Sequence, residues 1–421
     1  MILVYTLAQL IFLPILFIPL TAAVLIIPKY RMRFLHRLGF GLKKEKENKN
    51  RKTIWIHALS VGEVTSALPL ISGLNKEMEE VRLVFSATTT AGAELAQKLF
   101  HDKVDRFIPF PLDIPSVIKR FVHTVKPDLF ILVETDFWPG ILSTLKKQNI
   151  PTLLVNGRIS EKSMRSYKRF RFVFKPLFAS FHTLSMQNTK DKDNLIRLGV
   201  DHKQIETLGN LKYDTTLYST STKNQPLPFI LPEYTQLFVV GSTHAGEEKT
   251  ILQSYKQLKE KHPELYLVIA PRNIDRGRAI QRIAADMNLQ ANCRSQINAG
   301  GKDLFILDTI GELNLTYSHA DYAFVGGSLV EQGGHNPIEP AVFAVPVLYG
   351  PHMNDFHEIS EQLIQAGGAI KVQNHKELTM VLERLITDET YRQKTGKAAR
   401  SFIHSQQGVI KRHLQLIRCM L

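Results

Sequence analysis

The sequence FVGGSLVEQGGHNPIEPAVFAVPVLYGP, residues 324–351, decides the fold. An apolar run ends in the glycine pair 326–327, and a second pair, 333–334, precedes Asn336 and Pro337. This order predicts a buried strand, a glycine loop and a helix start, with Asn336 as the cap and Pro337 in the first turn. Glycines allow a ligand to approach the backbone N–H groups of a helix N-terminus, which suits a nucleotide. Two tight turns beside a strand explain the glycine pairs alone equally well.

The same order of strand, loop and helix extends along the chain. Apolar runs of strand length alternate with amphipathic helical stretches within residues 53–209 and again within residues 233–405. Such alternation predicts parallel sheets wrapped by helices, with ligands beyond the carboxyl ends of the strands. We therefore expect an α/β protein with two Rossmann-like, doubly wound parallel-sheet domains. The runs expected as strands are 54–58, 83–87, 107–110, 129–133, 152–155, 237–241, 266–270, 304–307, 322–325 and 346–349.

Length and composition agree with two domains. The chain has 421 residues, more than a single hydrophobic core usually organises. Residues 210–232, rich in Thr, Ser, Asn and Pro, are expected as the interdomain linker. Residues 406–421 are basic and amphipathic, and we expect a helix able to pack back on the N-terminal domain. The two cysteines, Cys293 and Cys419, fit neither a disulfide framework nor a zinc cluster.

The N-terminal segment has the character of a membrane anchor. Residues 1–28 carry no charged side chain, and such a helix is long enough to cross a bilayer. Pro14 and Pro19 leave an interfacial hairpin open as the alternative. Residues 29–52 form a basic linker, which by the positive-inside rule places the domains in the cytoplasm. With a formal charge of +14, we expect an anionic membrane surface as a partner and no nucleic acid.

Two carboxylates follow strands of the first domain. Glu63 comes after the first strand, near a helix start, where it could take a proton from an attacking hydroxyl. An ordinary first-turn Glu favoured by the helix dipole is the alternative. Glu134 ends another strand and could stabilise positive charge on a sugar ring or position the acceptor. The alternative is a buried carboxylate that binds the N–H groups of a helix start. Lys212, at the domain junction, could meet a phosphate or remain a surface lysine.

Three strand ends of the second domain carry groups that suit a phosphate. Gly241 opens a loop of hydroxyl and glycine residues, and Arg272 offers a guanidinium after another strand. Residues 308–312, DTIGE, end a third. These ends converge on one pocket in a doubly wound sheet. No GxGxxG follows any strand, which argues against a dinucleotide oxidoreductase.

Two further motifs leave alternatives open. Asp191 and Asp193 spell a DxD, a metal-binding pattern in some glycosyltransferases. We discount it because it lies at an apparent helix start, where acids cap the dipole. Residues 160–174 interleave basic and aromatic side chains, which predicts either a lipid-phosphate surface or a merely solvated face.

Seven motifs in this order resemble the 3-deoxy-D-manno-octulosonic acid (Kdo) transferases: HALSVGEV, VETDFWP, LGNLKYD, GSTHAGEE, APRN, DTIGEL and FVGGSLVEQGGHNPIEP. The resemblance implies a GT-B fold, with two domains facing a cleft. It implies transfer of Kdo from CMP-Kdo to a lipid A precursor (lipid IVA) at the cytoplasmic face of the inner membrane, in lipopolysaccharide inner-core biosynthesis. The reaction is expected to be inverting, with no cofactor and no metal.

The resemblance also assigns roles to residues of this chain. Glu63 matches the family's general base, and Glu134 and Lys212 match the residues that stabilise the transition state. The residues that match the CMP-binding positions are Pro271, Arg272, Ile310, Gly311, Glu312, Asn336, Pro337, Ile338 and Glu339.

Two other functions remain open on the sequence. The first is another membrane-associated GT-B glycosyltransferase that uses a UDP-sugar and a lipid-linked acceptor. The second is a non-catalytic lipid- or nucleotide-binding scaffold, against which the carboxylates Glu63 and Glu134 argue.

Overall fold

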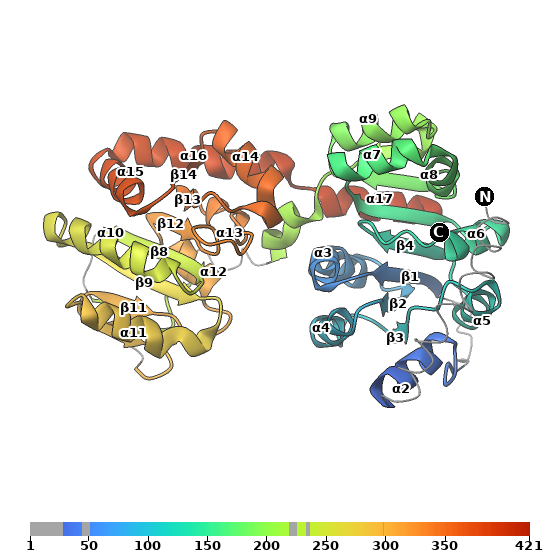
Figure 1. The fold of residues 1–421 in the computed structure, drawn as a ribbon, viewed down its shortest axis with the longest axis horizontal. Coiled ribbons are helices and arrows are strands. Elements are labelled where there is room, and N and C mark those ends of the chain that lie inside the picture. Colours follow the sequence, from blue (N-terminus) through green and yellow to red (C-terminus); the bar gives the residue numbers. More distant parts are fainter. Residues whose placement is uncertain (1–27, 44–50, 219–224, 233–235, 298) are drawn as a thin grey trace. The chain divides into compact units, whose positions relative to one another are not determined.

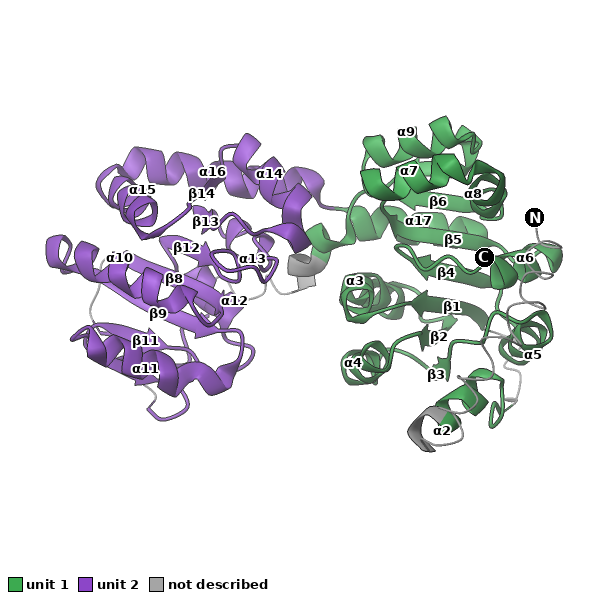
Figure 2. Ribbon diagram, in the orientation of Figure 1, with its two compact units in different colours: residues 1–215, 408–421 green, residues 216–407 purple. Residues whose placement is uncertain are grey.

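The computed structural model describes residues 28–43, 51–218, 225–232, 236–297 and 299–421. The chain forms two compact units, residues 1–215 with 408–421 and residues 216–407 (Figure 2). The expected membrane anchor lies outside the described residues, apart from residue 28. Within the described ranges, no helix combines the length and the apolar character needed to cross a membrane.

Unit 1 is built on a seven-stranded parallel sheet with strand order β3-β2-β1-β4-β5-β6-β7 (Figure 1). The strands are β1 (Lys52–Ala58), β2 (Val81–Ala87), β3 (Arg106–Pro109), β4 (Leu129–Val133), β5 (Thr152–Gly157), β6 (Thr183–Met186) and β7 (Ile205–Thr207). The first five coincide with predicted runs. The sequence analysis missed β6 and β7, which are short and carry polar residues.

Helices cover both faces of this sheet. Figure 1 shows α3 and α4 on one face and α5 and α6 on the other. The helices are α2 (Pro28–Arg37), α3 (Val61–Glu77), α4 (Thr90–Phe100), α5 (Pro115–Val125), α6 (Pro139–Lys147), α7 (Glu161–Arg169), α8 (Arg171–Phe178), α9 (Thr189–Leu198) and the 3-10 helices η1 (His202–Gln204) and η2 (Leu211–Tyr218). Residues 29–37, expected in a solvated linker, instead belong to α2, which lies beside β3.

The C-terminal helix α17 (Val409–Met420) belongs to unit 1 and packs on α3. Its first turn is held by the buried carboxylate of Asp214, which accepts hydrogen bonds from the N–H groups of Gly408 at 2.9 Å and Ile410 at 2.7 Å. His413 is also buried and lies 2.9 Å from the hydroxyl of Ser185, measured from Nε2. The chain end is therefore fixed to the sheet that carries the predicted carboxylates.

Unit 2 repeats the architecture with a parallel sheet of order β10-β11-β9-β8-β12-β13-β14. The strands are β8 (Gln236–Thr243), β9 (Leu265–Pro271), β10 (Ala291–Cys293), β11 (Leu304–Ile306), β12 (Tyr322–Val325), β13 (Val347–Tyr349) and β14 (Ala369–Lys371). The helices are α10 (Glu247–Lys261), η4 (Ile274–Arg276), α11 (Gly277–Asp286), α12 (Leu313–Ser318), α13 (Ile338–Ala341), η5 (Asn354–Phe356), α14 (His357–Gln365), α15 (His375–Thr387) and α16 (Glu389–Gln406). Two parallel seven-stranded sheets confirm the predicted α/β fold class.

Residues 324–351 run from β12 through the glycine loop and α13 to β13. Gly326 is required for space, because a Cβ there would lie 2.5 Å from the carbonyl oxygen of Ser242. The helix is a single turn, and its cap is Pro337 rather than the expected Asn336. Asn336 acts one residue earlier, where its side-chain oxygen accepts the N–H of Ile338 at 3.1 Å.

Candidate functional site

Glu63 lies in the first turn of α3, just beyond the carboxyl end of β1. Its side chain is buried, and its carboxylate accepts a hydrogen bond from the backbone N–H of Leu59. Burial raises the pKa of Glu63 from 4.5 to about 8. The Leu59 hydrogen bond opposes this rise, and the negative charges of Glu134 and Asp136 add to it. A carboxylate with a pKa near 8 is a stronger base than an ordinary glutamate and titrates close to neutral pH.

Glu134 follows β4 in the left-handed region, with φ 61°. Its N–H donates to the carbonyl of Val155 at 2.9 Å. The side-chain amide of Asn156 donates to its Oε1 at 3.0 Å. The side-chain oxygen of Asn156 in turn accepts the N–H of Leu211, the neighbour of Lys212, at 3.0 Å. Asn156, which was not predicted as a site residue, thus connects Glu134 to the backbone segment that precedes Lys212.

A buried histidine lies beside this group. His57 is fully buried in β1, and its Nε2 lies 2.9 Å from a carboxylate oxygen of Asp136. Its ring stacks on Phe110 with centroids 3.6 Å apart. Burial lowers the pKa of His57, although the hydrogen bond to Asp136 opposes this change. Its Nδ1 lies 3.1 Å from the carbonyl oxygen of Ser86, so both ring nitrogens of His57 have hydrogen-bond partners.

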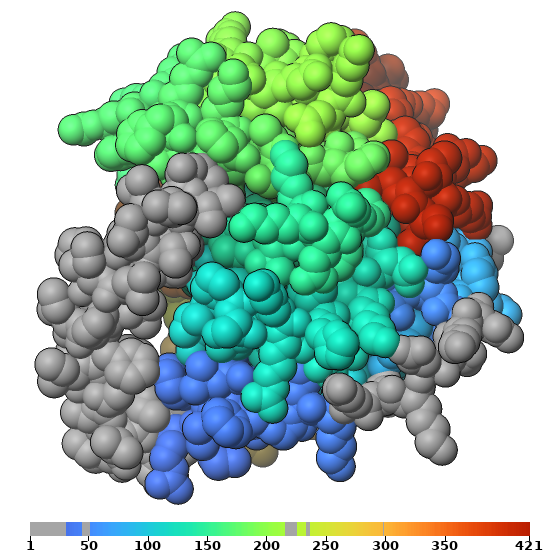
Figure 3. All heavy atoms as spheres, turned by 90° about the vertical axis from the view of Figure 1, so that its right-hand side faces the viewer, coloured from blue at the N-terminus to red at the C-terminus, as the bar shows by residue number. Residues whose placement is uncertain are grey.

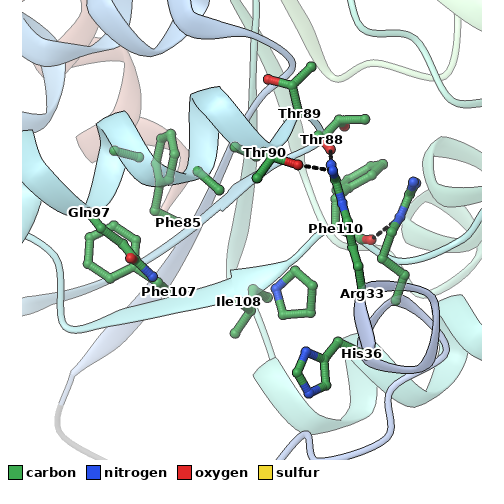
Figure 4. A pocket seen from close by; sticks show the side chains of 15 residues that line it. Arg33, His36, Phe85, Thr88, Thr89, Thr90, Gln97, Phe107, Ile108 and Phe110 are labelled. Carbon is green, nitrogen blue, oxygen red and sulfur yellow. Dashed lines mark hydrogen bonds between the residues drawn. The ribbon is translucent and has the colours of Figure 1, made fainter. Parts of the chain in front are cut away.

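A cavity of about 360 Å³ opens in unit 1 between α2, α4 and the strands β2 and β3 (Figure 4). Its wall is mostly apolar, with three basic side chains contributed by α2. Arg33 donates to the hydroxyl of Thr90 and the carbonyl of Thr88, and Arg37 donates Nε–H to the carbonyl of Phe110 at 3.0 Å. The lining residues are Arg33, His36, Arg37, Phe85, Ala87, Thr88, Thr89, Thr90, Ala93, Ala96, Gln97, Phe107, Ile108, Pro109 and Phe110.

The predicted nucleotide contacts lie at strand ends of unit 2. Pro271 is the last residue of β9, and the exposed Arg272 follows it. Ile310, in the loop after β11, is 82% exposed, and Gly311 has φ 97°. Glu312 forms an ion pair with Arg294, whose Nη2 lies 3.0 Å from its Oε1.

Asn336 and Glu339 lie together at α13, where the amide of Asn336 donates to Oε1 of Glu339 at 3.2 Å. Burial raises the pKa of Glu339, opposed by this hydrogen bond and by the charge of Arg272. Arg272 and Glu339 therefore lie within electrostatic range of each other, although they come from different strand ends. Pro337 caps α13, and the side chain of Ile338 is buried.

Glu247 of α10 binds the backbone of the glycine loop. Both carboxylate oxygens of this buried residue accept the N–H of Gly327, at 2.8 and 2.9 Å. His244 and His335 face each other beside the loop, with their Nε2 atoms 2.8 Å apart. These three side chains were not predicted as site residues, although all lie in the motifs GSTHAGEE and GGHNPIEP.

Asp191 of the DxD motif forms hydrogen bonds with the backbone of unit 1. Asp191 is buried in α9 and its Oδ1 accepts the N–H of Ile159 at 3.0 Å. Its own N–H donates to the cap residue Asn188 at 2.8 Å. Asp191 therefore tethers the start of α9 to the backbone at Ile159.

Comparison with known proteins assigns both units. Residues 32–215 match the family described as 3-deoxy-D-manno-octulosonic-acid transferase (kdotransferase), and residues 247–402 match glycosyl transferases group 1. The chain is 31% identical over 395 residues to the 3-deoxy-D-manno-octulosonic acid transferase of Haemophilus influenzae, covering 93% of this chain and 92% of that relative. It is 32% identical over 386 residues to the enzyme of the same name from Rickettsia bellii, covering 90% of each.

Two solved structures share the fold at low identity. A glycosyltransferase from Rickettsia africae has a TM-score of 0.54 at 12% identity, covering 88% of this chain and 99% of that chain. UDP-GlcNAc 2-epimerase from Neisseria meningitidis has a TM-score of 0.54 at 15% identity, covering 84% and 98%. These likenesses show a GT-B-like fold. The relatives confirm the resemblance read from the seven motifs: the chain belongs to the 3-deoxy-D-manno-octulosonic acid (Kdo) transferase family and is a glycosyltransferase that transfers Kdo in lipopolysaccharide biosynthesis.

Proposed function

We propose that the chain transfers Kdo from CMP-Kdo to a lipid A precursor (lipid IVA), with inversion and without a metal, and that Glu63 is the general base. The observation that carries this proposal is the burial of Glu63, which raises its pKa to about 8 beside Glu134. An acceptor hydroxyl is a weak acid, so its attack needs a base of this kind.

In the proposed step, the ionised Glu63 takes the proton of an acceptor hydroxyl. The hydroxyl oxygen forms a bond to the anomeric carbon of Kdo as the bond from that carbon to the CMP phosphate oxygen breaks. The bonding electrons leave with CMP. Glu134 stabilises positive charge on the sugar ring, and Lys212 offsets negative charge on the leaving phosphate.

The donor nucleotide is assigned to unit 2, at the loops of Arg272, Gly311 and Asn336. Arg272 offers an exposed guanidinium directly after β9. Calorimetry with CMP tests this assignment: Glu339→Ala should weaken binding, because the Asn336 side chain loses a partner. Unchanged CMP affinity would remove Glu339 from the nucleotide site.

The cavity of unit 1 suits an acyl chain of the acceptor. Its apolar wall favours hydrocarbon, and the basic side chains of Arg33, His36 and Arg37 can meet an acceptor phosphate. A lipid A precursor combines these two properties. We therefore assign this cavity to the lipid part of the acceptor.

A surface of unit 1 suits an anionic membrane. The two helices α7 and α8 present Phe170 and Phe172, which are 45% and 72% exposed. The basic residues of the same segment are Lys162, Arg165, Lys168, Arg169 and Arg171. Exposed aromatic rings between cations fit the interface of an anionic bilayer. Figure 3 shows this part of unit 1 in green, at the top of the face in view. We propose that the chain works at the cytoplasmic face of the inner membrane, with residues 1–28 as its anchor.

The experiment that tests the function is a transfer assay with purified full-length protein, CMP-Kdo and lipid IVA, read by mass spectrometry. A thermal-shift comparison accompanies it: CMP should stabilise the protein more than UDP at equal concentration. Stabilisation by UDP alone would favour a UDP-sugar donor instead.

A further inference from the structure

We propose that Asn156 is a positioning residue for the transfer reaction, which holds the carboxylate of Glu134 and the backbone that carries Lys212 in one arrangement. The inference rests on the proposed function, because it assumes that these two residues act on the sugar and the leaving group. Nothing in the sequence marked Asn156: it precedes a glycine at the end of β5, where Asn-Gly usually indicates a turn.

The contacts of Asn156 connect three segments of unit 1. The residue is completely buried. Its amide nitrogen donates to Glu134 at 3.0 Å, and its side-chain oxygen accepts the N–H of Leu211 at 3.0 Å. Its carbonyl accepts the side-chain amide of Gln187 at 3.0 Å. A side chain that donates to one predicted catalytic residue and accepts from the neighbour of another fixes both.

The backbone at this point is strained in a way that points to function. Glu134 and Asn156 both have left-handed φ, 61° and 58° respectively, at the ends of neighbouring strands. Left-handed backbone is unfavourable for residues other than glycine, and such residues concentrate at sites that need them. Asparagine tolerates this conformation better than most residues, and here it also supplies the required donor and acceptor.

Only a neutral amide serves both partners. An aspartate at this position could still accept the N–H of Leu211, but it could not donate to a carboxylate. It would also add a negative charge to the group formed by Glu63, Glu134 and Asp136. Glu63 already feels the charges of the other two, so a third charge should raise its pKa further.

The test compares Asn156→Gly and Asn156→Asp in the full-length protein. Asn156→Gly keeps the left-handed backbone and removes the amide, whereas Asn156→Asp reverses the charge relation to Glu134. The matched controls are Asn149→Gly and Asn149→Asp. Asn149 also has a left-handed φ, 57°, but is exposed after α6.

We expect both Asn156 variants to lose about 10²-fold in kcat, because small displacements of positioned groups cost about this much. The KM for CMP-Kdo and the CMP affinity should stay unchanged, since the nucleotide is assigned to unit 2. In Asn156→Asp, the pH at which kcat is half-maximal should rise by about half a unit or more. This shift reports the added charge, whereas a loss of kcat at unchanged KM in Asn156→Gly separates a positioning role from a merely structural one. The Asn149 variants should match wild type in each measurement.

Two results would overturn the inference, and they differ from each other. If Glu63→Gln and Glu134→Gln lose transfer while both Asn156 variants keep the wild-type kcat and pH profile, Asn156 does not position the site. If Glu63→Gln and Glu134→Gln keep full transfer, the proposed catalytic roles are wrong and the inference falls with them. CMP affinity and the thermal midpoint identify a variant that fails to fold. If Asn156→Asp fails, Asn156→Gly alone decides through its kcat.

Discussion

Replacing Glu63 with glutamine should change the pH dependence of stability in a defined direction. The folded protein holds the Glu63 proton with a pKa of about 8, against 4.5 for an unperturbed glutamate. Folding therefore favours the neutral form of Glu63. The contribution of this neutral side chain to the stability of the folded protein is fully present below pH 4.5. It is lost as the pH rises toward and through 8, because the buried side chain must then ionise. Glutamine remains neutral throughout, so Glu63→Gln should not lose stability in this way.

The size of the effect follows from the two pKa values. A difference of about 3.5 pH units corresponds to roughly 5 kcal/mol at about 1.4 kcal/mol per unit. This is an upper limit, since water that enters the site would solvate the ionised carboxylate. We expect the two proteins to have similar stability at about pH 5 and the variant to be more stable, by several kcal/mol, at about pH 9.

Tryptophan fluorescence follows the unfolding of unit 1, which contains Glu63. The chain has two tryptophans, Trp55 and Trp138, and both lie in unit 1. Urea unfolding followed at tryptophan emission, at several pH values, gives the stability difference between wild type and Glu63→Gln. Glu94→Gln on α4 is the control, because that residue is exposed. A difference between Glu63→Gln and wild type that stays constant from pH 5 to pH 9 would refute the raised pKa.

Three further predictions concern the lipid cavity, the membrane surface and the C-terminal helix. Ala93→Trp should fill the cavity and raise the KM for the lipid acceptor about tenfold or more, which corresponds to about 1.4 kcal/mol of acceptor binding free energy. Ala91→Trp, on the exposed side of α4, should leave this KM unchanged. Equal KM values for the two variants would exclude the cavity as the acceptor site. Phe172→Asp should reduce sedimentation of the protein with anionic vesicles, whereas Met380→Asp, in unit 2 and 64% exposed, should leave it unchanged. An equal loss in both variants would exclude the surface of α7 and α8 as a specific membrane contact. Asp214→Ala should destabilise unit 1 by about 1 to 3 kcal/mol in urea unfolding, because two N–H groups at the start of α17 lose their acceptor; wild-type stability would contradict this role.

The sequence predicted the fold class because its signals are local. Apolar runs long enough to be buried strands alternate with helical patterns, and this alone specifies parallel sheets. The strands that it missed, such as β6 and β7, are three or four residues long and carry no continuous apolar run. The helix α2 was missed because a basic segment resembles a solvated linker, and its contact with β3 depends on residues more than 60 positions away.

The sequence pointed to individual side chains but not to the contacts that set their chemistry. Glu63 and Glu134 could be located because they follow buried strands. The raised pKa of Glu63 could not be predicted, since it arises from burial and from charges at Glu134 and Asp136, about 70 positions along the chain. The hydrogen bond from the N–H of Leu211 to the side-chain oxygen of Asn156 likewise joins residues 55 positions apart. Such contacts exist only once the sheet has formed.

The proposed mechanism depends on Glu63 as the base for transfer of Kdo to a lipid A precursor. The most direct measurement is mass spectrometry of lipid IVA after incubation with CMP-Kdo and either wild-type protein or Glu63→Gln. With the wild-type protein, we expect a product heavier than lipid IVA by one or more Kdo residues. With Glu63→Gln, we expect the rate of transfer to be lower by about 10² to 10⁴. An unmodified lipid with the wild-type protein, or near-wild-type transfer by Glu63→Gln, would contradict this mechanism.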